Sequence, residues 1–266
     1  AAAGKDTLLI ADTFNRRIEE FSSAGQVLAM LGGDPQALGQ FNRPSSVAVD
    51  GAGNVYVTDQ ASDRLEKLSA SGQALAQWGT TGIQAGQFDQ PSGIALDDGG
   101  NVYVADTGNN RVQKLGPTGE ALAQWGSGGA GPGEFNGPSG LTLDAAGDIY
   151  VADSNNNRLQ KLSSSGAPLA QWGSTGDGPG QFTSPQGLAM DQQGNLYVAD
   201  TGNNRIQKLS PDGQPVAQWG TKGSGPGEFV SPGAVTVDTA GNVYVVDSGN
   251  ARVQELSPSG QALDQW

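Results

Sequence analysis

The chain has 266 residues and a formal charge of −13, and it contains neither Cys nor His. Without these residue types it can form no disulfide, no Ser-His or Cys-His nucleophile pair and no His-ligated zinc site. Its 14 cations lie mostly at two repeated positions, the exceptions being Lys5, Arg16, Arg43 and Lys222. Nucleic-acid binding needs a basic stripe and is therefore excluded, and no apolar run approaches the ~18 residues of a membrane span.

One segment returns at a fixed interval through the whole chain. Its aspartates are 47 residues apart, as 106 − 59 = 47 shows for two successive copies. A period of this length with four short apolar segments per copy predicts a β-propeller. Since the repeat leaves no boundary at which to divide the chain, we expect a single domain, 1–266. Its repeats are 1–38, which is partial, 39–85, 86–132, 133–179, 180–226 and 227–266.

The third copy shows the expected elements in chain order. Residues 93–97 form a short apolar first strand, and 101–106 form a second strand with nonpolar side chains on both faces, which predicts burial between neighbouring blades. Hairpin turns lead to a third strand, 111–115, and a fourth, 121–125. Because polarity rises from the first strand to the last, we expect an all-β, six-bladed β-propeller of four-stranded antiparallel blades with its apolar strands inside.

The first copy is shorter than the others. Residues 1–3 align with 95–97, so the first blade lacks most of its innermost strand. A propeller pairs the two ends of its chain, and an unpaired sheet edge accepts further strands. Three explanations stay open: the short segment suffices, residues precede Ala1, or a neighbouring molecule supplies the strand by self-association.

An Asp and an Arg recur on either side of the second hairpin loop of every copy. They could form a ring of charges that binds a polar ligand, but we favour a structural clasp in which each Arg holds the Asp across its own hairpin. The pairs are Asp12 and Arg17, Asp59 and Arg64, Asp106 and Arg111, Asp153 and Arg158, Asp200 and Arg205, and Asp247 and Arg252.

The same loops are rich in asparagine. Asn tolerates left-handed backbone and bonds its own turn, so turn chemistry is one interpretation. An amide-rich rim that hydrogen-bonds sugars or peptide backbone is the other, and it predicts a binding face. Its candidate residues are Asn15, Asn109, Asn110, Asn155, Asn156, Asn157, Asn203, Asn204 and Asn250.

Two further residue sets recur once per blade. A Trp at the fourth strand, such as Trp125, could stack on a sugar, but we expect it to cover the seam between blades. An Asp in the first turn, such as Asp97, could contribute to a calcium site, although no local run supplies the six or more oxygens of a dedicated one. We therefore expect a solvated acidic rim, no catalytic or metal-ligating residue and no cofactor, with calcium as the open alternative.

The run from Gly100 through Asp106, followed by Asn109, Asn110 and Arg111, resembles an NHL repeat. The resemblance covers five full copies and most of the first, and it implies a six-bladed propeller whose loop face binds partners. Some members of the family bind RNA through a basic face, which this acidic chain lacks. Others are zinc lyases that need His, and related six-bladed lactonases hold a central calcium. Bacterial members also serve as extracytoplasmic sensor or adhesion modules.

These observations predict a non-enzymatic binding or scaffold propeller, extracellular or in the cell envelope, that engages a protein or a glycan through its Asn-bearing loop face. The alternative is a calcium-dependent lactonase or lyase with carboxylates at the central channel. The copies are nearly identical, whereas an active site needs residues that differ from blade to blade and converge. The predicted partners include no nucleic acid and no membrane, and they include a second copy of the chain through the first blade.

Overall fold

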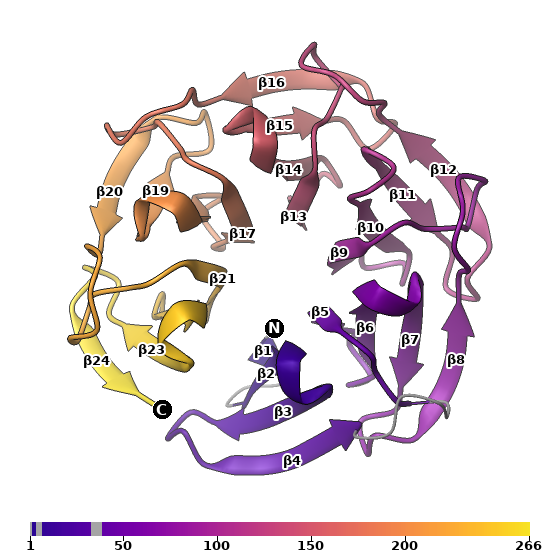
Figure 1. Cartoon of the computed structure of the whole chain (residues 1–266), viewed down its shortest axis with the longest axis horizontal. Helices are drawn as coiled ribbons and strands as arrows, with labels where there is room; N and C mark the ends of the chain where they lie inside the picture. The colour runs from indigo at the N-terminus through magenta and orange to yellow at the C-terminus, as the bar shows by residue number, and fades with distance from the viewer. Residues whose placement is uncertain (1, 4–6, 33–38) are drawn as a thin grey trace. The chain divides into compact units, whose positions relative to one another are not determined.

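The computed structural model describes residues 2–3, 7–32 and 39–266 (Figure 1). They form six four-stranded antiparallel sheets, each in chain order. These sheets are the blades of a six-bladed β-propeller, so the predicted fold class is confirmed. The chain falls into two compact units, Ala1–Gly128 and Gly129–Trp266, with three blades in each.

In its described residues, the first unit contains twelve strands and two short 3-10 helices, η1 and η2, in its hairpin loops. They are β1 (Ala2–Ala3), β2 (Thr7–Asp12), η1 (Thr13–Asn15), β3 (Arg17–Ser22), β4 (Val27–Gly32), β5 (Pro44–Val49), β6 (Val55–Asp59), η2 (Gln60–Ser62), β7 (Arg64–Leu68), β8 (Ala74–Trp78), β9 (Pro91–Leu96), β10 (Val102–Asp106), β11 (Arg111–Leu115) and β12 (Ala121–Trp125). The first blade begins with β1, which has two residues where β5 and β9 have six, so its predicted short innermost strand is confirmed.

The second unit repeats the same order. Its elements are β13 (Pro138–Leu143), β14 (Ile149–Asp153), η3 (Ser154–Asn156), β15 (Arg158–Leu162), β16 (Pro168–Trp172), β17 (Pro185–Met190), β18 (Leu196–Asp200), η4 (Thr201–Asn203), β19 (Arg205–Leu209), β20 (Pro215–Trp219), β21 (Pro232–Val237), β22 (Val243–Asp247), η5 (Ser248–Asn250), β23 (Arg252–Leu256) and β24 (Ala262–Gln265). No helix among the described residues has the length and apolar character of a membrane span.

The second strand of each blade lies at the centre of the packing. All five residues of β10 are buried, as expected for a strand with apolar side chains on both faces. On one side Val102 and Val104 join a cluster with Phe88 and with Tyr56 and Leu65 of the preceding blade. Fourth strands such as β12 are mostly exposed. The rise in polarity from the inner to the outer strands of each copy therefore matches the decrease in burial across the blade.

Candidate functional site

Each hairpin is organised by its repeated aspartate, which in blade three is the fully buried Asp106. Oδ2 of Asp106 accepts hydrogen bonds from Arg111 Nε at 2.7 Å, Asn109 Nδ2 at 2.9 Å and Gln113 Nε2 at 2.9 Å. Oδ1 accepts the backbone amide of Asp89 at 2.8 Å. The charge of the carboxylate is thus compensated within the blade, and its oxygens are held by nitrogen donors.

The arginine partner extends this network beyond the hairpin. Besides Asp106, Arg111 donates through Nη1 to Ile83 O and Gln124 Oε1, both at 2.7 Å, and through Nη2 to Gln84 O at 3.0 Å and Gln87 O at 2.9 Å. Every donor of its rigid fork is used, which ties the loop that enters the blade to the hairpin. The same set of bonds recurs at Arg158, Arg205 and Arg252.

Five of the nine candidate asparagines belong to the same network. Asn109 Nδ2 donates to Asp106 and to Gly82 O at 2.9 Å, so its amide nitrogen bridges the hairpin and the preceding loop. The three equivalent residues with the same pair of bonds are Asn156, Asn203 and Asn250. Asn15, which is exposed, donates to Asp12 at 2.8 Å. These amide nitrogens hold the loops in shape.

A second group of loop residues adopts left-handed backbone. Asn110, Asn157 and Asn204 have φ of 54°, 54° and 56°. At three junctions inside the units, the side-chain oxygen at this position accepts the backbone amide of a residue that leads into the next blade, a contact that we call the Asx latch. The latches are Asp63 with Gln90 at 2.7 Å, Asn157 with Ser184 at 2.8 Å and Asn204 with Ser231 at 2.9 Å.

The remaining candidate, Asn155, is exposed at the second position of its loop. Its Nδ2 donates to Oδ1 of the exposed Asn136 at 3.2 Å, and its backbone amide donates to Asn136 O at 3.1 Å. The two side chains therefore form an amide pair on the loop surface. Whereas the Asn109 amide bonds a buried aspartate, the Asn155 amide bonds another exposed side chain.

The aspartates of the first turn cap that turn instead of forming a solvated rim. Asp97 Oδ1 accepts the amides of Gly99 and Asn101, and its Oδ2 accepts the Asn101 side chain at 2.7 Å. Burial opposes ionisation of Asp97, but the hydrogen bonds from Asn101, the charge of Lys114 and the Tyr103 hydroxyl together outweigh it and lower the pKa of the carboxyl group. Lys114 lies 3.5 Å from this carboxylate and 4.9 Å from the Tyr103 ring centroid. The expected rim is corrected to a hydrogen-bonded and partly neutralised turn.

The repeated tryptophans pack at blade seams inside each unit. Trp78 lies 6.1 Å from the Tyr56 ring in its own blade, and a Cβ placed on Gly119 of the next blade would be 2.1 Å from its indole. Gly119 is therefore required both by this contact and by its φ of +91°. The equivalent pairs are Trp172 with Gly213 and Trp219 with Gly260.

The last blade replaces the repeated lysine with Glu255. The Tyr244 hydroxyl lies 3.1 Å from Glu255 Oε1 and 3.3 Å from Asp238 Oδ2. Burial raises the pKa of Glu255, and the carboxylate of Asp238 acts in the same direction. Within the described residues, no three acidic side chains are arranged so that they could hold a metal ion. The calcium alternative stays a prediction.

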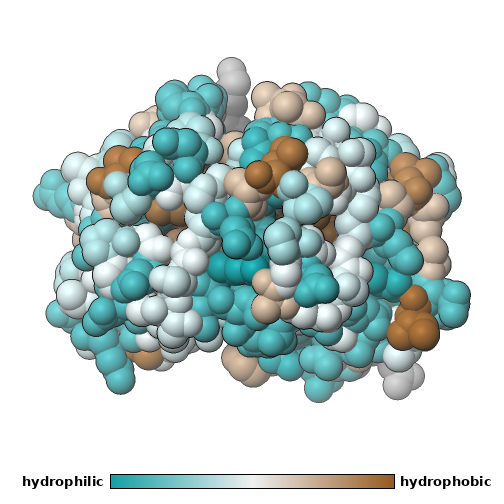
Figure 2. Space-filling model, turned by 90° about the horizontal axis from the view of Figure 1, so that it is seen from above, coloured by the Kyte–Doolittle hydropathy of each residue, from teal (hydrophilic) through white to brown (hydrophobic). Residues whose placement is uncertain are grey.

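Hydrophobic side chains also recur once per blade on the outer strands, where they are about half exposed. They are Leu28, Leu75, Leu122, Leu169, Val216 and Leu263. On the face shown in Figure 2, hydrophobic side chains are separated by hydrophilic ones and do not merge into a large patch. Singly exposed aliphatic residues of this kind are normal on globular domains.

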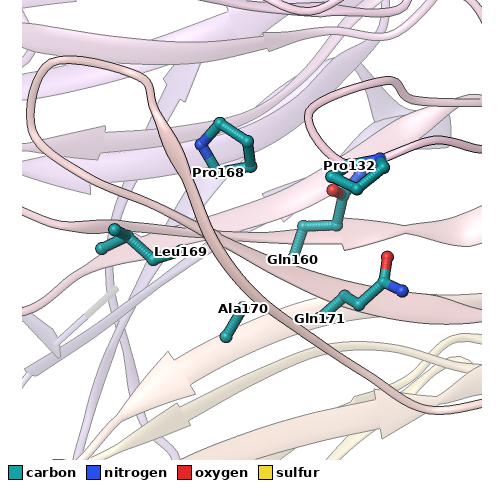
Figure 3. Close-up of a pocket in the computed structure, with 6 residues that line it drawn as sticks. All are labelled: Pro132, Gln160, Pro168, Leu169, Ala170 and Gln171. Carbon is teal, nitrogen blue, oxygen red and sulfur yellow. The ribbon is translucent and has the colours of Figure 1, made fainter.

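A shallow groove of about 300 Å³ lies beside β16 (Figure 3). Gln160 stands at its base, but both ends of the Gln160 amide are already bonded, to Gly133 N and to Glu134 O. Pro132 and Pro168 form its walls, together with Leu169, Ala170 and Gln171. The groove therefore offers a ligand few polar groups that are not already hydrogen-bonded.

The second blade departs from the repeat, and the sequence reasoning missed the departure. Glu66 stands where blades three to six have the glutamine that donates to the aspartate, and it is fully buried. Arg64 pairs with it at 2.5 Å, while Arg64 Nε stands 3.4 Å from Asp59 and has no hydrogen-bond partner among the described residues. Burial raises the pKa of Glu66. The signal was visible at the glutamine position, which is acidic in the first two copies, as Glu19 and Glu66.

Comparisons with known proteins agree with this architecture. The family model described as NHL repeat matches residues 88–115, 135–162, 182–209 and 229–256. The comparison with curated protein sequences found no match. Among solved structures, the chain is similar to virginiamycin B lyase from Staphylococcus aureus, with a TM-score of 0.68 and 15% identity over 100% of this chain and 82% of that one.

Two more solved structures share the fold. A chain of the nidogen/laminin complex has a TM-score of 0.73 and 21% identity, covering 99% of this chain and 93% of that chain. A Bacteroides caccae protein of unknown function has a TM-score of 0.73 and 13% identity, covering 98% and 93%. Identities this low show a shared fold and nothing further. Together with the four matched repeats, the shared fold shows that this chain is an NHL-repeat β-propeller.

Proposed function

We propose that this chain is a non-enzymatic binding propeller that engages a protein or a glycan through its loop face. The loop face consists of the loops between second and third strands and the segments that lead into the first strands. Two such parts touch within each of blades three to six, for example where Gly108 N donates to Asp89 O at 2.8 Å and Asn155 N donates to Asn136 O at 3.1 Å. The face is therefore built from adjoining loops on a rigid framework.

The proposal rests on the positions at which the blades differ from one another. The Asp and Arg positions of the hairpins are the same in every blade and the Gln position in blades three to six, whereas the exposed second residue of the loop is Phe, Ala or Asn in three blades and Gly in the other three. These exposed residues are Phe14, Ala61, Gly108, Asn155, Gly202 and Gly249. Variable loops on a constant scaffold are the usual arrangement for recognition.

The neighbouring segment varies in the same way. The residues that follow the repeated buried Phe are Asn42, Asp89, Asn136, Thr183 and Val230. In blades three to six each lies beside the exposed second residue of the loop, whose backbone amide donates to its carbonyl oxygen. The two positions therefore present a different chemical pair on each of these blades, which favours an asymmetric partner such as a folded protein over a repeated small ligand. The similar propeller of the nidogen/laminin complex belongs to a protein assembly, which also supports a protein partner.

The experiment is a binding screen of the immobilised chain against glycan and protein arrays, followed by surface variants. Ala61→Lys and Asn155→Lys alter the loop face, while Leu122→Lys adds the same charge on the exposed outer strand β12. For a partner seated on the loop face, we expect at least one loop variant to weaken binding about tenfold, as for a central contact of an interface, and Leu122→Lys to leave it unchanged. Calcium-dependent turnover of a lactone, or sensitivity to Leu122→Lys alone, would overturn the proposal.

A further inference from the structure

The junction between the first and second blades differs from the other junctions described inside the two units. Elsewhere the left-handed loop residue is Asp or Asn, and its oxygen closes the Asx latch. At this junction the two latch positions are Arg16 (63 − 47 = 16) and Arg43 (90 − 47 = 43). Arg16 keeps the left-handed backbone, with φ of 59°. Its guanidinium has no acceptor atom, so the latch cannot form.

The backbone of Arg43 has changed accordingly. Gln90, Ser184 and Ser231, at the same position in other blades, have φ of 51°, 47° and 49°, whereas Arg43 has no positive φ. Its amide turns inward and donates to Asp59 Oδ1 at 2.7 Å, next to the amide of Asn42 at 3.0 Å. The backbone amides at the entry to the second blade are thus hydrogen-bonded without the latch, and the two arginine side chains are left on the loop face.

The two residues occupy one place on the surface of the first unit. A Cβ placed on Gly32 would lie 2.9 Å from Arg16 O and 2.7 Å from the Phe41 ring, and Arg43 follows Phe41 by two positions. Both arginines are exposed. Across residues 2–3, 7–32 and 39–266, neither guanidinium makes a hydrogen bond or an ion pair. This sets them apart from framework arginines such as Arg111, whose donors are all used.

We propose that Arg16 and Arg43 bind a carboxylate-rich segment of a partner protein, an inference that rests on the proposed function of the loop face. Guanidinium groups pair with carboxylates through two parallel hydrogen bonds, and an acidic segment is repelled by most of a chain of charge −13. The exposed amide of Asn42 and the Phe14 ring, which is 90% exposed, flank the pair. An amide and an aromatic ring beside two cations suit a peptide chain.

The test is fluorescence anisotropy with a fluorescein-labelled peptide of ten residues that alternates Glu and Gly and carries one Leu. Two variants have the same net charge: Arg16→Gln with Arg43→Gln gives −13 − 2 = −15, and Lys222→Glu gives −13 − 2 = −15. Lys222 is an exposed cation in the second unit. We expect the double variant to weaken binding about tenfold, the control less than about twofold, and affinity to fall with added salt.

Equal losses in both variants would overturn the inference, because they would show a general charge effect. So would tighter binding of a sialylated glycan than of the peptide at the same arginines. The outcome also separates the two proposals. A partner from the array screen that is lost with Asn155→Lys but not with the arginine variant leaves the binding propeller standing and removes this site.

Discussion

At the level of single residues, the second blade concentrates the exceptions to an otherwise uniform network. Where Gln113 donates to Asp106, Glu66 instead accepts the backbone amide of Gly39 and pairs with Arg64, whose Nε stands 3.4 Å from Asp59. Two buried carboxylates then share one guanidinium. A buried charge with an incomplete set of partners lowers stability, so this blade holds a stability cost that blades three to six lack.

We therefore expect Glu66→Gln to raise the free energy of unfolding at pH 7 by about 1–3 kcal/mol, because it restores the donor used in blades three to six. The pKa of folded Glu66 is raised by burial, so the folded state binds a proton more tightly than the unfolded state. The penalty from Glu66 is thus absent below the unfolded pKa and grows as pH rises through the folded pKa. Urea unfolding of the parent and of Glu66→Gln at pH 4 and pH 7 measures the difference between their free energies of unfolding, which should be larger at pH 7.

The reciprocal variant Gln113→Glu is the matched control for this prediction. Gln113 is fully buried in blade three and makes the bonds that Glu66 cannot. It should lose a similar free energy of unfolding and acquire the same pH dependence. A Gln113→Glu protein as stable as the parent would contradict the assignment of the cost to the lost amide donor.

The framework arginines supply a second prediction for single residues. Arg111→Met removes the charge that pairs with the buried Asp106 and leaves loop carbonyls unbonded, so we expect a loss of about 3–5 kcal/mol in thermal or urea unfolding. Arg17→Met is the control, since its side chain is 33% exposed and the pair with Asp12 is partly solvated. It should cost about 1 kcal/mol or less. Equal costs would show that burial does not decide the strength of the clasp.

At the level of strands and turns, packing between blades matters as much as the hydrogen bonds within a sheet. In blades three, five and six, the turn before the fourth strand passes close to the indole of the preceding blade, and only glycine fits. Gly119 meets this demand against Trp78. Backbone conformation adds to it, because φ at Gly119 is +91°. The seam is therefore sensitive to one added methyl group.

Gly119→Ala is expected to lower the free energy of unfolding by about 2–4 kcal/mol, from backbone strain and from the clash with Trp78. Gly100→Ala separates the two causes. Its φ is +77° but its nearest contact would be 3.6 Å away, so it should show the strain alone, about 1 kcal/mol. The difference between the two variants, measured by urea unfolding, is the cost of the seam contact. Equal losses in the two variants would show that the contact between Gly119 and Trp78 does not contribute to the cost.

Across the molecule as a whole, the repeated carboxylates accept hydrogen bonds from turns and pair with cationic side chains of the chain itself. They are therefore not free to bind cations. In blade three, Asp106 accepts only nitrogen donors, and Asp97 is bonded to its own turn and lies beside Lys114. Because most blades repeat these contacts, an acidic chain of charge −13 keeps much of its negative charge locally compensated. A bound calcium ion would have to displace donors that are already in place.

We expect 1 mM calcium chloride or 1 mM EDTA to leave the melting temperature unchanged within about 1 °C, since a ligand stabilises only the state it binds. Differential scanning calorimetry at constant ionic strength is the measurement. A calcium-dependent rise would point to the acidic group of the last blade, where Glu255 stands beside Asp238. Glu255→Lys, which restores the residue of the four preceding blades, would then abolish the rise.

The fold class, the number of blades, their four strands and the burial gradient across them could all be predicted from the sequence. A 47-residue period records these features directly, because each copy must solve the same local packing problem. The period also placed Asp106 and Arg111 at opposite ends of one hairpin, where the structure pairs them at 2.7 Å.

Which polar side chains are used within the fold, and which remain exposed, followed only from the three-dimensional packing. Asn109 and Asn155 look alike in the sequence, yet one bridges Asp106 to a preceding loop and the other lies on the surface. The two arginines that replace an Asx latch become exposed because the contact they interrupt joins residues from different copies. Such contacts depend on how neighbouring blades pack, and the residues of one repeat do not specify them.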